Sequence, residues 1–198
     1  MIAEVDVVFV MNTLLKLRRV FGHLKLANRG IFLEAGSGPG KNVYVAALTH
    51  SWQRCVGIDM RQSFTDHATR LKLRFDDDTC SFLTEKQRQE RDNDSIDFVC
   101  GNFFDTDLLV TASVVYVDLT CMPSDPLRRF TNMLDDLATA AVVITLTRPL
   151  DTSKFFLLWT DPHVATSWGT TTAFIYERKP PTGDDDDDDD DDHNVHDE

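Results

Sequence analysis

The hydrophobic positions of this chain fall into short continuous runs that alternate with stretches of helical spacing. Continuous apolar runs predict strands buried on both faces, and they occur at residues 31–34, 55–59, 96–100, 113–118 and 141–146. Apolar residues at helical spacing lie between them, at residues 41–49, 61–73 and 125–137. Strands alternating with helices predict an α/β fold, with a mainly parallel sheet, right-handed crossovers and helices on both faces.

The N-terminal part of the chain precedes this alternation. Residues 5–10 are apolar at most positions and predict a strand. Asn12 or Thr13 can cap a helix whose apolar positions include Leu14 and Leu17. We therefore expect residues 1–30 to form an extension made of a strand and a helix, ahead of a main domain that spans residues 31–179.

The second half of the chain interrupts the alternation twice. The acidic stretch 75–79 breaks the apolar pattern, and a polar helix is expected at 81–91. Asp125 is placed to cap the helix that begins there. Residues 155–159 and 171–177 then predict two strands with no full helix between them. Such a closing pair indicates an antiparallel end to a sheet of seven strands.

Most of the net charge is carried by the C-terminal end. The 198 residues have a formal net charge of −13, but nine aspartates at 184–192 and two acids at 197–198 make up 11 of the 33 acidic residues. The rest of the chain, with 22 acids against 20 bases, is nearly neutral. Adjacent like charges repel one another, so residues 180–198 are predicted to be a disordered tail. It is either a solubilising end or an attraction for a basic partner such as a histone.

Composition also argues against several classes of protein. No apolar run is long enough to predict a transmembrane helix, so we expect no membrane partner. A nearly neutral body lacks the basic patch of a nucleic-acid-binding protein. The histidines are scattered and the cysteines form no C-x-x-C pair, which predicts core thiols and no metal site. Free thiols and the absence of an export signal favour the nucleus or the cytoplasm.

A glycine-rich turn follows the strand predicted at 31–34. The order Glu34-Ala35-Gly36-Ser37-Gly38-Pro39-Gly40 places an acid at the end of a strand and three glycines at alternate positions. Glycine is needed where the backbone has positive φ, or where a ligand lies against the chain. The helix that begins after such a turn offers free backbone N–H groups to an anionic group. The turn is either a cofactor site or a structural link between strand and helix.

Two other glycine motifs fit this turn poorly. The dinucleotide motif is G-x-G-x-x-G, and here the third glycine comes one residue early. The phosphate loop is G-x-x-x-x-G-K-[ST], but Ala35 stands at its first glycine and Asn42 at its last position. The strand predicted at 55–59 also ends in an acid, Asp59. A carboxylate at this point of a Rossmann-like fold accepts hydrogen bonds from ribose hydroxyls; alternatively, Asp59 caps the next helix.

The spacing acid-x-G-x-G-x-G, followed by Asp59, resembles the first motifs of class I S-adenosylmethionine-dependent methyltransferases. The resemblance implies a Rossmann-like fold with S-adenosyl-L-methionine as cofactor. It implies that Asn102 and Phe103, after the third strand, lie at the adenine. The other residues that it implies for cofactor binding are Glu34, Gly36, Ser37, Gly38, Gly40, Asp59 and Met60.

A narrower resemblance covers about residues 31–179. The polar step after the fourth strand, the segment 145–149 and the residues Ser167-Trp168-Gly169 are similar to the non-SET histone-lysine methyltransferases of the disruptor-of-telomeric-silencing family and their small protist relatives. This resemblance implies a chromatin enzyme that methylates a lysine of a histone or another basic protein. Asp118 and Thr120, at the carboxyl end of a strand, would line the path of the methyl acceptor.

The chain departs from this family at several positions. The family usually has an asparagine at Asp118 and an acid at Asn102. It also has a Tyr-Gly-Glu loop before the first strand, which residues 1–30 lack. Two alternatives therefore remain open: an inactive methyltransferase-like binding module, and a small-molecule or RNA methyltransferase on the same scaffold.

Overall fold

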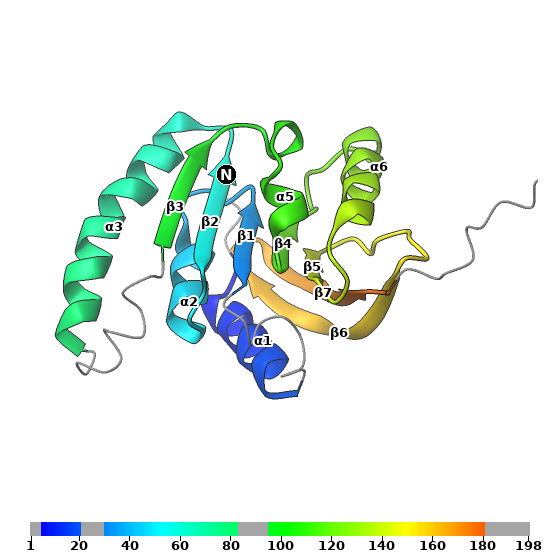
Figure 1. The fold of residues 1–198 in the computed structure, drawn as a ribbon, viewed down its shortest axis with the longest axis horizontal. Coiled ribbons are helices and arrows are strands. Elements are labelled where there is room, and N and C mark those ends of the chain that lie inside the picture. Colours follow the sequence, from blue (N-terminus) through cyan, green and yellow to red (C-terminus); the bar gives the residue numbers. More distant parts are fainter. Residues whose placement is uncertain (1–4, 21–29, 83–94, 181–198) are drawn as a thin grey trace, which may run out of the picture.

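The structure, a computed structural model, describes residues 5–20, 30–82 and 95–180. Figure 1 shows a twisted sheet with helices on both sides. The strands are β1 (Ile31–Ala35), β2 (Arg54–Asp59), β3 (Ser95–Cys100), β4 (Val114–Asp118), β5 (Val142–Leu146), β6 (Phe155–Thr166) and β7 (Gly169–Arg178). The helices are α1 (Val7–Val20), α2 (Lys41–Thr49), α3 (Gln62–Phe82), α5 (Leu108–Thr111) and α6 (Ser124–Met133), with short 3-10 turns η2 (Phe103–Asp105) and η3 (Leu134–Asp136).

The sheet has seven strands in the order β3-β2-β1-β4-β5-β7-β6. Strands β1 to β5 pair in parallel, whereas β7 runs antiparallel to both β5 and β6. The predicted fold class, a mainly parallel Rossmann-like sheet with an antiparallel end, is confirmed. The strand order reverses between β1 and β4, and ligands of open α/β sheets bind at the carboxyl ends of strands at such a switch point.

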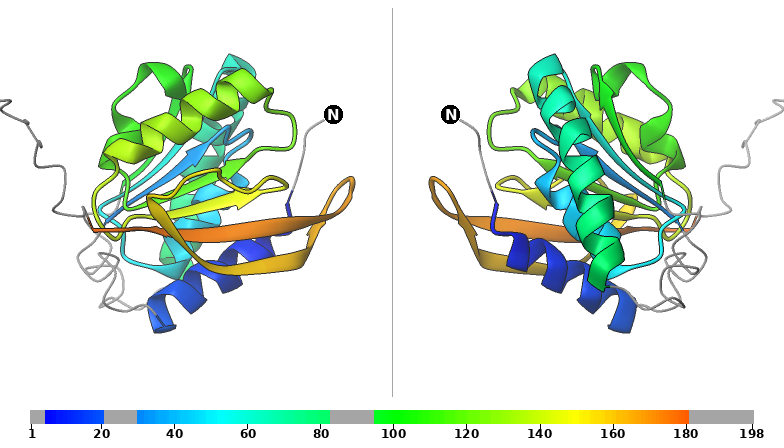
Figure 2. Two further views of the ribbon diagram at one scale, coloured as in Figure 1. Left: turned by 90° about the vertical axis from the view of Figure 1, so that its right-hand side faces the viewer. Right: turned by 90° about the vertical axis from the view of Figure 1, so that its left-hand side faces the viewer.

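Each face of the sheet is covered by its own hydrophobic cluster. On one face, Val10 and Leu17 of α1 and Val43 of α2 pack against Phe32 and Ile144 of the sheet. On the other face, residues of α5, α6 and η3 pack against alternate residues of the same strands, including Leu33 and Val143. Figure 2 shows these helices on opposite sides of the sheet. Helix α1 therefore belongs to the packed fold.

The N-terminal prediction was partly wrong. The predicted strand at 5–10 is the start of α1, which runs from Val7 to Val20 and does not begin at Asn12 or Thr13. Val10, Leu14 and Leu17 are buried at successive turns of this helix. Their packing against α2 outweighs the strand propensity of the N-terminal valines. The predicted apolar positions after residue 20 lie outside the described residues.

Three further predictions differ from the structure. Helix α3 continues through the acidic stretch 75–79 as far as Phe82, while most of the polar helix expected at 81–91 lies outside the described residues. Pro123, not Asp125, precedes the first residue of α6. Cys100 and Cys121 are exposed free thiols, whereas only Cys55 matches the expected core position among the described cysteines. The tail beyond residue 180 is not described.

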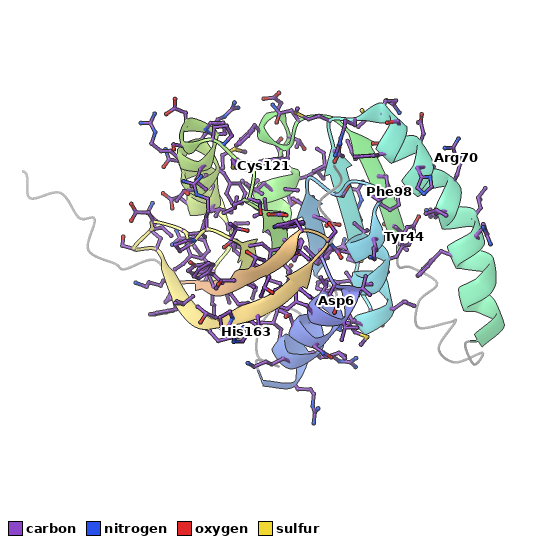
Figure 3. The ribbon with its side chains drawn as sticks, turned by 180° about the vertical axis from the view of Figure 1, so that it is seen from behind. Asp6, Tyr44, Arg70, Phe98, Cys121 and His163 are labelled. Carbon is purple, nitrogen blue, oxygen red and sulfur yellow. The ribbon has the colours of Figure 1, made fainter. Side chains whose placement is uncertain are left out.

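The final strands form a hairpin much longer than predicted. Strand β6 extends to Thr166 and β7 begins at Gly169, so only Ser167 and Trp168 connect them. The chain before α1 contacts the end of this hairpin, because the Asp6 amide donates to the Ala165 carbonyl at 3.0 Å. Figure 3 labels Asp6 near β6. Among the described residues, no helix is long and apolar enough to cross a membrane.

Candidate active site

The glycine turn between β1 and α2 has the backbone that its sequence predicts. Gly36, Gly38 and Gly40 have φ angles of 79°, 53° and 82°, which side chains rarely tolerate. The amides of Gly36 and Ser37 donate to the carbonyl of Ile58 at 2.8 and 3.0 Å, which ties the turn to β2. No atom lies within 4 Å of where a Cβ would stand on Gly36 or Gly38. Open space therefore lies over these two glycines.

Gly40 has a different role from the first two glycines. A Cβ on Gly40 would stand 2.3 Å from the side chain of Phe98. Phe98 packs against Tyr44 with ring centroids 5.4 Å apart, and Figure 3 labels both side chains near α2 and β3. Gly40 thus lets α2 approach the sheet closely. Its predicted contact with the cofactor stays a prediction.

A cavity of about 300 Å³ lies beside the turn and extends to the end of β4. This volume is at the lower end of the range for small-molecule sites. The cavity joins residues from both ends of the predicted site, although β1 and β4 are far apart in the sequence. The predicted residues that line it are Glu34, Gly36, Ser37, Gly38, Asp118 and Thr120.

The cavity also has walls that the sequence analysis did not predict. Among them are Val5, Lys41, Arg61, Tyr116 and Cys121. Tyr116 could have been found from strand periodicity, because it lies two positions before Asp118 and therefore on the same face of β4. Val5 lines this cavity because the N-terminal segment contacts the β6–β7 hairpin. This contact is tertiary, so the sequence around Val5 does not predict it.

Two buried oxygens at this cavity have no hydrogen-bond partner in the described part of the chain. They are Oε2 of Glu34 and the hydroxyl of Tyr116, which lie opposite each other in β1 and β4. The other oxygen of Glu34 accepts from the Asn42 side-chain amide at 2.7 Å. Buried polar atoms are almost always hydrogen-bonded, so these two oxygens are available to a polar ligand that enters the cavity.

Burial changes the acid–base behaviour of this pair. It raises the pKa of Glu34 from 4.5 to about 8, against the opposing effects of the Asn42 side chain and the Val43 backbone amide. Burial also raises the pKa of Tyr116 well above its ordinary value, and the nearby Glu34 carboxyl adds to that rise. Burial therefore favours the protonated form of both groups in the free protein, and a cation beside Glu34 would favour its ionised form.

Asp59, the predicted ribose ligand, lies at the end of β2 and does not line the cavity. Its Oδ2 accepts from the Gly38 amide at 2.9 Å, and its Oδ1 accepts from the Arg61 amide at 2.9 Å. Asp59 thus orders the glycine turn and also bonds to Arg61, the residue that precedes α3. Oδ2 keeps one acceptor position for a further donor.

The three residues expected beyond Asp59 also lie outside the cavity. Met60 is 71% exposed. Asn102 caps η2, because its side-chain oxygen accepts from the Phe104 amide at 3.1 Å. Phe103 packs against Phe104 and Phe130, with ring centroids 4.3 and 5.9 Å away, so it is at least partly a core residue. The roles of Asn102 and Phe103 at adenine, and of Met60 in cofactor binding, stay predictions.

The predicted acceptor residues meet at the carboxyl end of β4. Asp118 Oδ1 accepts from both the amide and the hydroxyl of Thr120, at 2.9 and 2.5 Å. No donor to Oδ2 of Asp118 is found among the described residues. A carboxylate oxygen that lines a cavity without a partner can accept a hydrogen bond from a ligand.

The family of the chain follows from its sequence as a whole. The family described as histone methylation protein DOT1 matches residues 2–161. This chain belongs to the DOT1 family. The expected resemblance to the non-SET histone-lysine methyltransferases is confirmed. No curated protein matches the chain in sequence.

Solved structures resemble this DOT1-family chain in fold. An RNA methyltransferase from Salinibacter ruber, in complex with S-adenosyl-L-homocysteine, is 20% identical with a TM-score of 0.57, over 90% of this chain and 95% of its own. The magnesium protoporphyrin IX methyltransferase from Synechocystis, with bound S-adenosylmethionine, is 12% identical with a TM-score of 0.57, over 85% and 78%. An rRNA methylase from Streptococcus thermophilus is 12% identical with a TM-score of 0.51, over 81% and 95%. The fold is that of class I methyltransferases.

Proposed function

We propose that this chain transfers a methyl group from S-adenosyl-L-methionine to a lysine of a basic protein such as a histone. The observation that carries the proposal is the cavity that joins the glycine turn to Asp118 and Thr120. A methyltransferase must hold its cofactor and its acceptor in one continuous space, and this cavity connects the two sets of residues. Membership of the DOT1 family supports the choice of a protein lysine.

The residues at the turn fit the cofactor. The space over Gly36 and Gly38 has room for a ligand against the backbone. Glu34 Oε2 and the Tyr116 hydroxyl, both buried and unsatisfied, could accept hydrogen bonds from the ammonium group of the methionine part. The first amides of α2 could receive its carboxylate, and the free acceptor position on Asp59 could receive a ribose hydroxyl.

The residues at the end of β4 fit an amine acceptor. When bound, S-adenosylmethionine supplies a methyl group on a sulfonium, which is already an activated leaving group. The chain itself must therefore orient the acceptor and exclude water. Asp118 Oδ2 would accept an N–H of the amine and hold its lone pair in line. Orientation of this kind contributes about 7–11 kcal/mol in the best cases, and no general base is required if the amine loses its proton to water first.

The charge at this end favours an amine over a nucleic acid. The Asp118 carboxylate attracts a lysine side chain and repels a phosphate backbone, while the basic residues Lys41 and Arg61 also line the cavity. The body of the chain is nearly neutral, whereas RNA-binding surfaces are usually basic. The acidic residues at 184–192 are a further attraction for a basic substrate.

Radiolabelled methyl transfer tests the proposal. The purified protein would be incubated with tritiated S-adenosylmethionine and, separately, histone octamers, total RNA or a metabolite extract. We expect label in histone, no label with Gly38→Arg, which fills the open space, and full activity with Gln53→Arg at an exposed loop position. Label in RNA or metabolites alone would contradict the lysine acceptor. Failure of calorimetry to detect S-adenosylmethionine binding would contradict the enzyme itself.

A further inference from the structure

A chain of threonine hydroxyls leads away from Asp118. The Thr120 hydroxyl lies 2.5 Å from Asp118 Oδ1 and 2.6 Å from the Thr147 hydroxyl. The Thr147 hydroxyl lies 2.9 Å from that of Thr171. These threonines come from three separate segments: the loop after β4, the turn after β5, and β7. This chain of hydroxyls therefore connects the end of the acceptor site with the antiparallel part of the sheet.

The proton in each of these hydrogen bonds has a fixed direction. An ionised carboxylate can only accept, so Thr120 donates its single hydroxyl proton to Asp118. Thr120 must then accept from Thr147, and Thr147 must in turn accept from Thr171. All three protons point toward Asp118. Hydrogen bonds in such a series polarise one another, which strengthens the final bond to the carboxylate.

Thr147, the middle member of this series of hydroxyls, has a strained backbone conformation. Its φ is 71°, which is unusual for a β-branched residue. The amide of Arg148 donates to the carbonyl of Leu146 at 2.8 Å, so Thr147 is the central residue of a γ-turn of the rare positive-φ type. Strain of this kind persists where the surrounding structure imposes it, and it clusters at functional sites.

The same turn is also bonded to the loop after β4 and to β7. The guanidinium of Arg148 donates to the Met122 carbonyl at 2.8 Å, and the Thr147 amide donates to the Thr172 carbonyl at 2.8 Å. Thr120 and Thr147 are exposed, where water could satisfy their hydroxyls. Glycine would relieve the backbone strain, so folding alone does not explain a threonine at 147.

We infer that Thr147 and Thr171 are positioning residues, which fix Asp118 Oδ1 through Thr120 so that Oδ2 faces the methyl acceptor. The inference rests on the proposed function, because it assigns Asp118 to the acceptor amine. With Oδ1 bound to both the amide and the hydroxyl of Thr120, rotation of the carboxylate would break two hydrogen bonds. Oδ2 is thereby held as the acceptor for one N–H of the substrate.

Three substitutions at Thr147 test the inference. Thr147→Val removes the hydroxyl and keeps the shape, Thr147→Ser keeps the hydroxyl, and Thr147→Gly removes both the hydroxyl and the strain. At saturating S-adenosylmethionine, we expect Thr147→Val and Thr147→Gly to lower kcat/KM for the acceptor by about two- to tenfold, the loss typical of a hydrogen bond between uncharged groups. Ser should remain close to wild type. The cofactor Kd, measured by calorimetry, should stay the same in all three.

Two further measurements test the positioning role without methyltransferase activity. The Thr120 amide, bonded to Asp118, should exchange with deuterium at least about tenfold faster in Thr147→Val than in wild type or Thr147→Ser. The melting temperature of Thr147→Gly should equal or exceed that of wild type. Equal exchange and equal kcat/KM in Val and Ser, or a lower melting temperature with Gly, would overturn the inference. If wild type methylates no acceptor, the proposed function fails, and amide exchange and melting alone decide the positioning role.

Discussion

The Asp59 carboxylate accepts the backbone amide of Gly38 across 2.9 Å, which joins the end of β2 to the turn after β1. Asp59 is 8% exposed, so this bond is shielded from water. One side chain thus sets the shape of the turn and also presents an oxygen near it. The glycine turn and the second-strand acid form one structural unit, although 21 residues separate them in sequence.

Replacement of Asp59 should therefore affect folding and cofactor binding together. Asp59→Asn keeps one side-chain oxygen for the two backbone donors, Gly38 and Arg61, so one donor loses its partner. We expect a loss of about 1–3 kcal/mol in the free energy of unfolding and at least tenfold weaker S-adenosylmethionine binding by calorimetry. Asp66→Asn, at an exposed position of α3, is the matched control. Unchanged binding in Asp59→Asn would exclude Asp59 as a cofactor ligand.

Buried Glu34 predicts that stability depends on pH. Its pKa is about 8 in the folded protein against 4.5 ordinarily, so between these values the folded state holds a proton that the unfolded state has lost. The stabilisation of the folded state by this proton is complete below pH 4.5 and is lost as the pH rises toward 8. The free energy of unfolding then falls with pH at a slope that approaches about 1.4 kcal/mol per pH unit.

Glu34→Gln isolates this linkage because glutamine has no proton to lose. Urea unfolding of both proteins at pH 5, 6, 7, 8 and 9 gives the difference in the free energy of unfolding. We expect wild type to lose stability relative to Glu34→Gln from pH 5 to 8 and the difference to level off above that. Parallel curves over the whole range would show that Glu34 titrates normally.

The glycines of the turn should respond differently to alanine. Gly40→Ala places a Cβ 2.3 Å from Phe98 at a φ of 82°, so overpacking and backbone strain add to about 2–5 kcal/mol of destabilisation. Gly38→Ala meets no atom within 4 Å at a φ of 53°, and only backbone strain of about 1–2 kcal/mol applies.

Gly38→Ala should also weaken cofactor binding directly, apart from its effect on stability. The methyl group of Gly38→Ala points into the open space where we place the cofactor, so binding should weaken even though most of the protein is folded. Thermal melting measures the loss of stability, and calorimetry at low temperature measures the loss of cofactor affinity. Normal affinity in folded Gly38→Ala would place the cofactor elsewhere.

The centre of this fold is predictable because its signals are local. The run at 31–34, the glycine turn and the strand that ends at Asp59 are each encoded within a few residues. The same locality explains the prediction of Asp118, which ends a strand at a carboxyl edge. The N-terminal segment lacks this property, because its valines suit a strand and only the packing of Val10 and Leu14 against α2 selects the helix.

The hairpin and the turn at Thr147 depend on tertiary structure. Pro162 lies within β6, where proline usually ends a strand, but β6 is an edge strand and its register shifts between Asp161 and Val164. The positive φ of Thr147 has no sequence signal, since threonine disfavours it. The contact of Thr147 with Thr120 arises only when β4 and β5 pair side by side.

Cys121 provides a chemical test of where ligands bind. It is an exposed free thiol that lines the cavity beside Thr120, and Figure 3 labels it. S-adenosylhomocysteine in the cavity should block its alkylation by iodoacetamide. At a concentration ten times the Kd, only about one-tenth of the protein is free, so the labelling rate of Cys121 should fall about tenfold, as measured by peptide mass spectrometry.

Cys100 is the internal control for this protection. It is also an exposed free thiol, but its Sγ lies 3.7 Å from the Met60 carbonyl and outside the cavity. Its labelling rate should change much less than that of Cys121. Alkylated wild type should bind S-adenosylmethionine more weakly, and Cys121→Ser should resist this loss because a serine hydroxyl does not react. Equal protection of both cysteines would indicate global stabilisation, whereas no protection of Cys121 would place the ligand away from the end of β4.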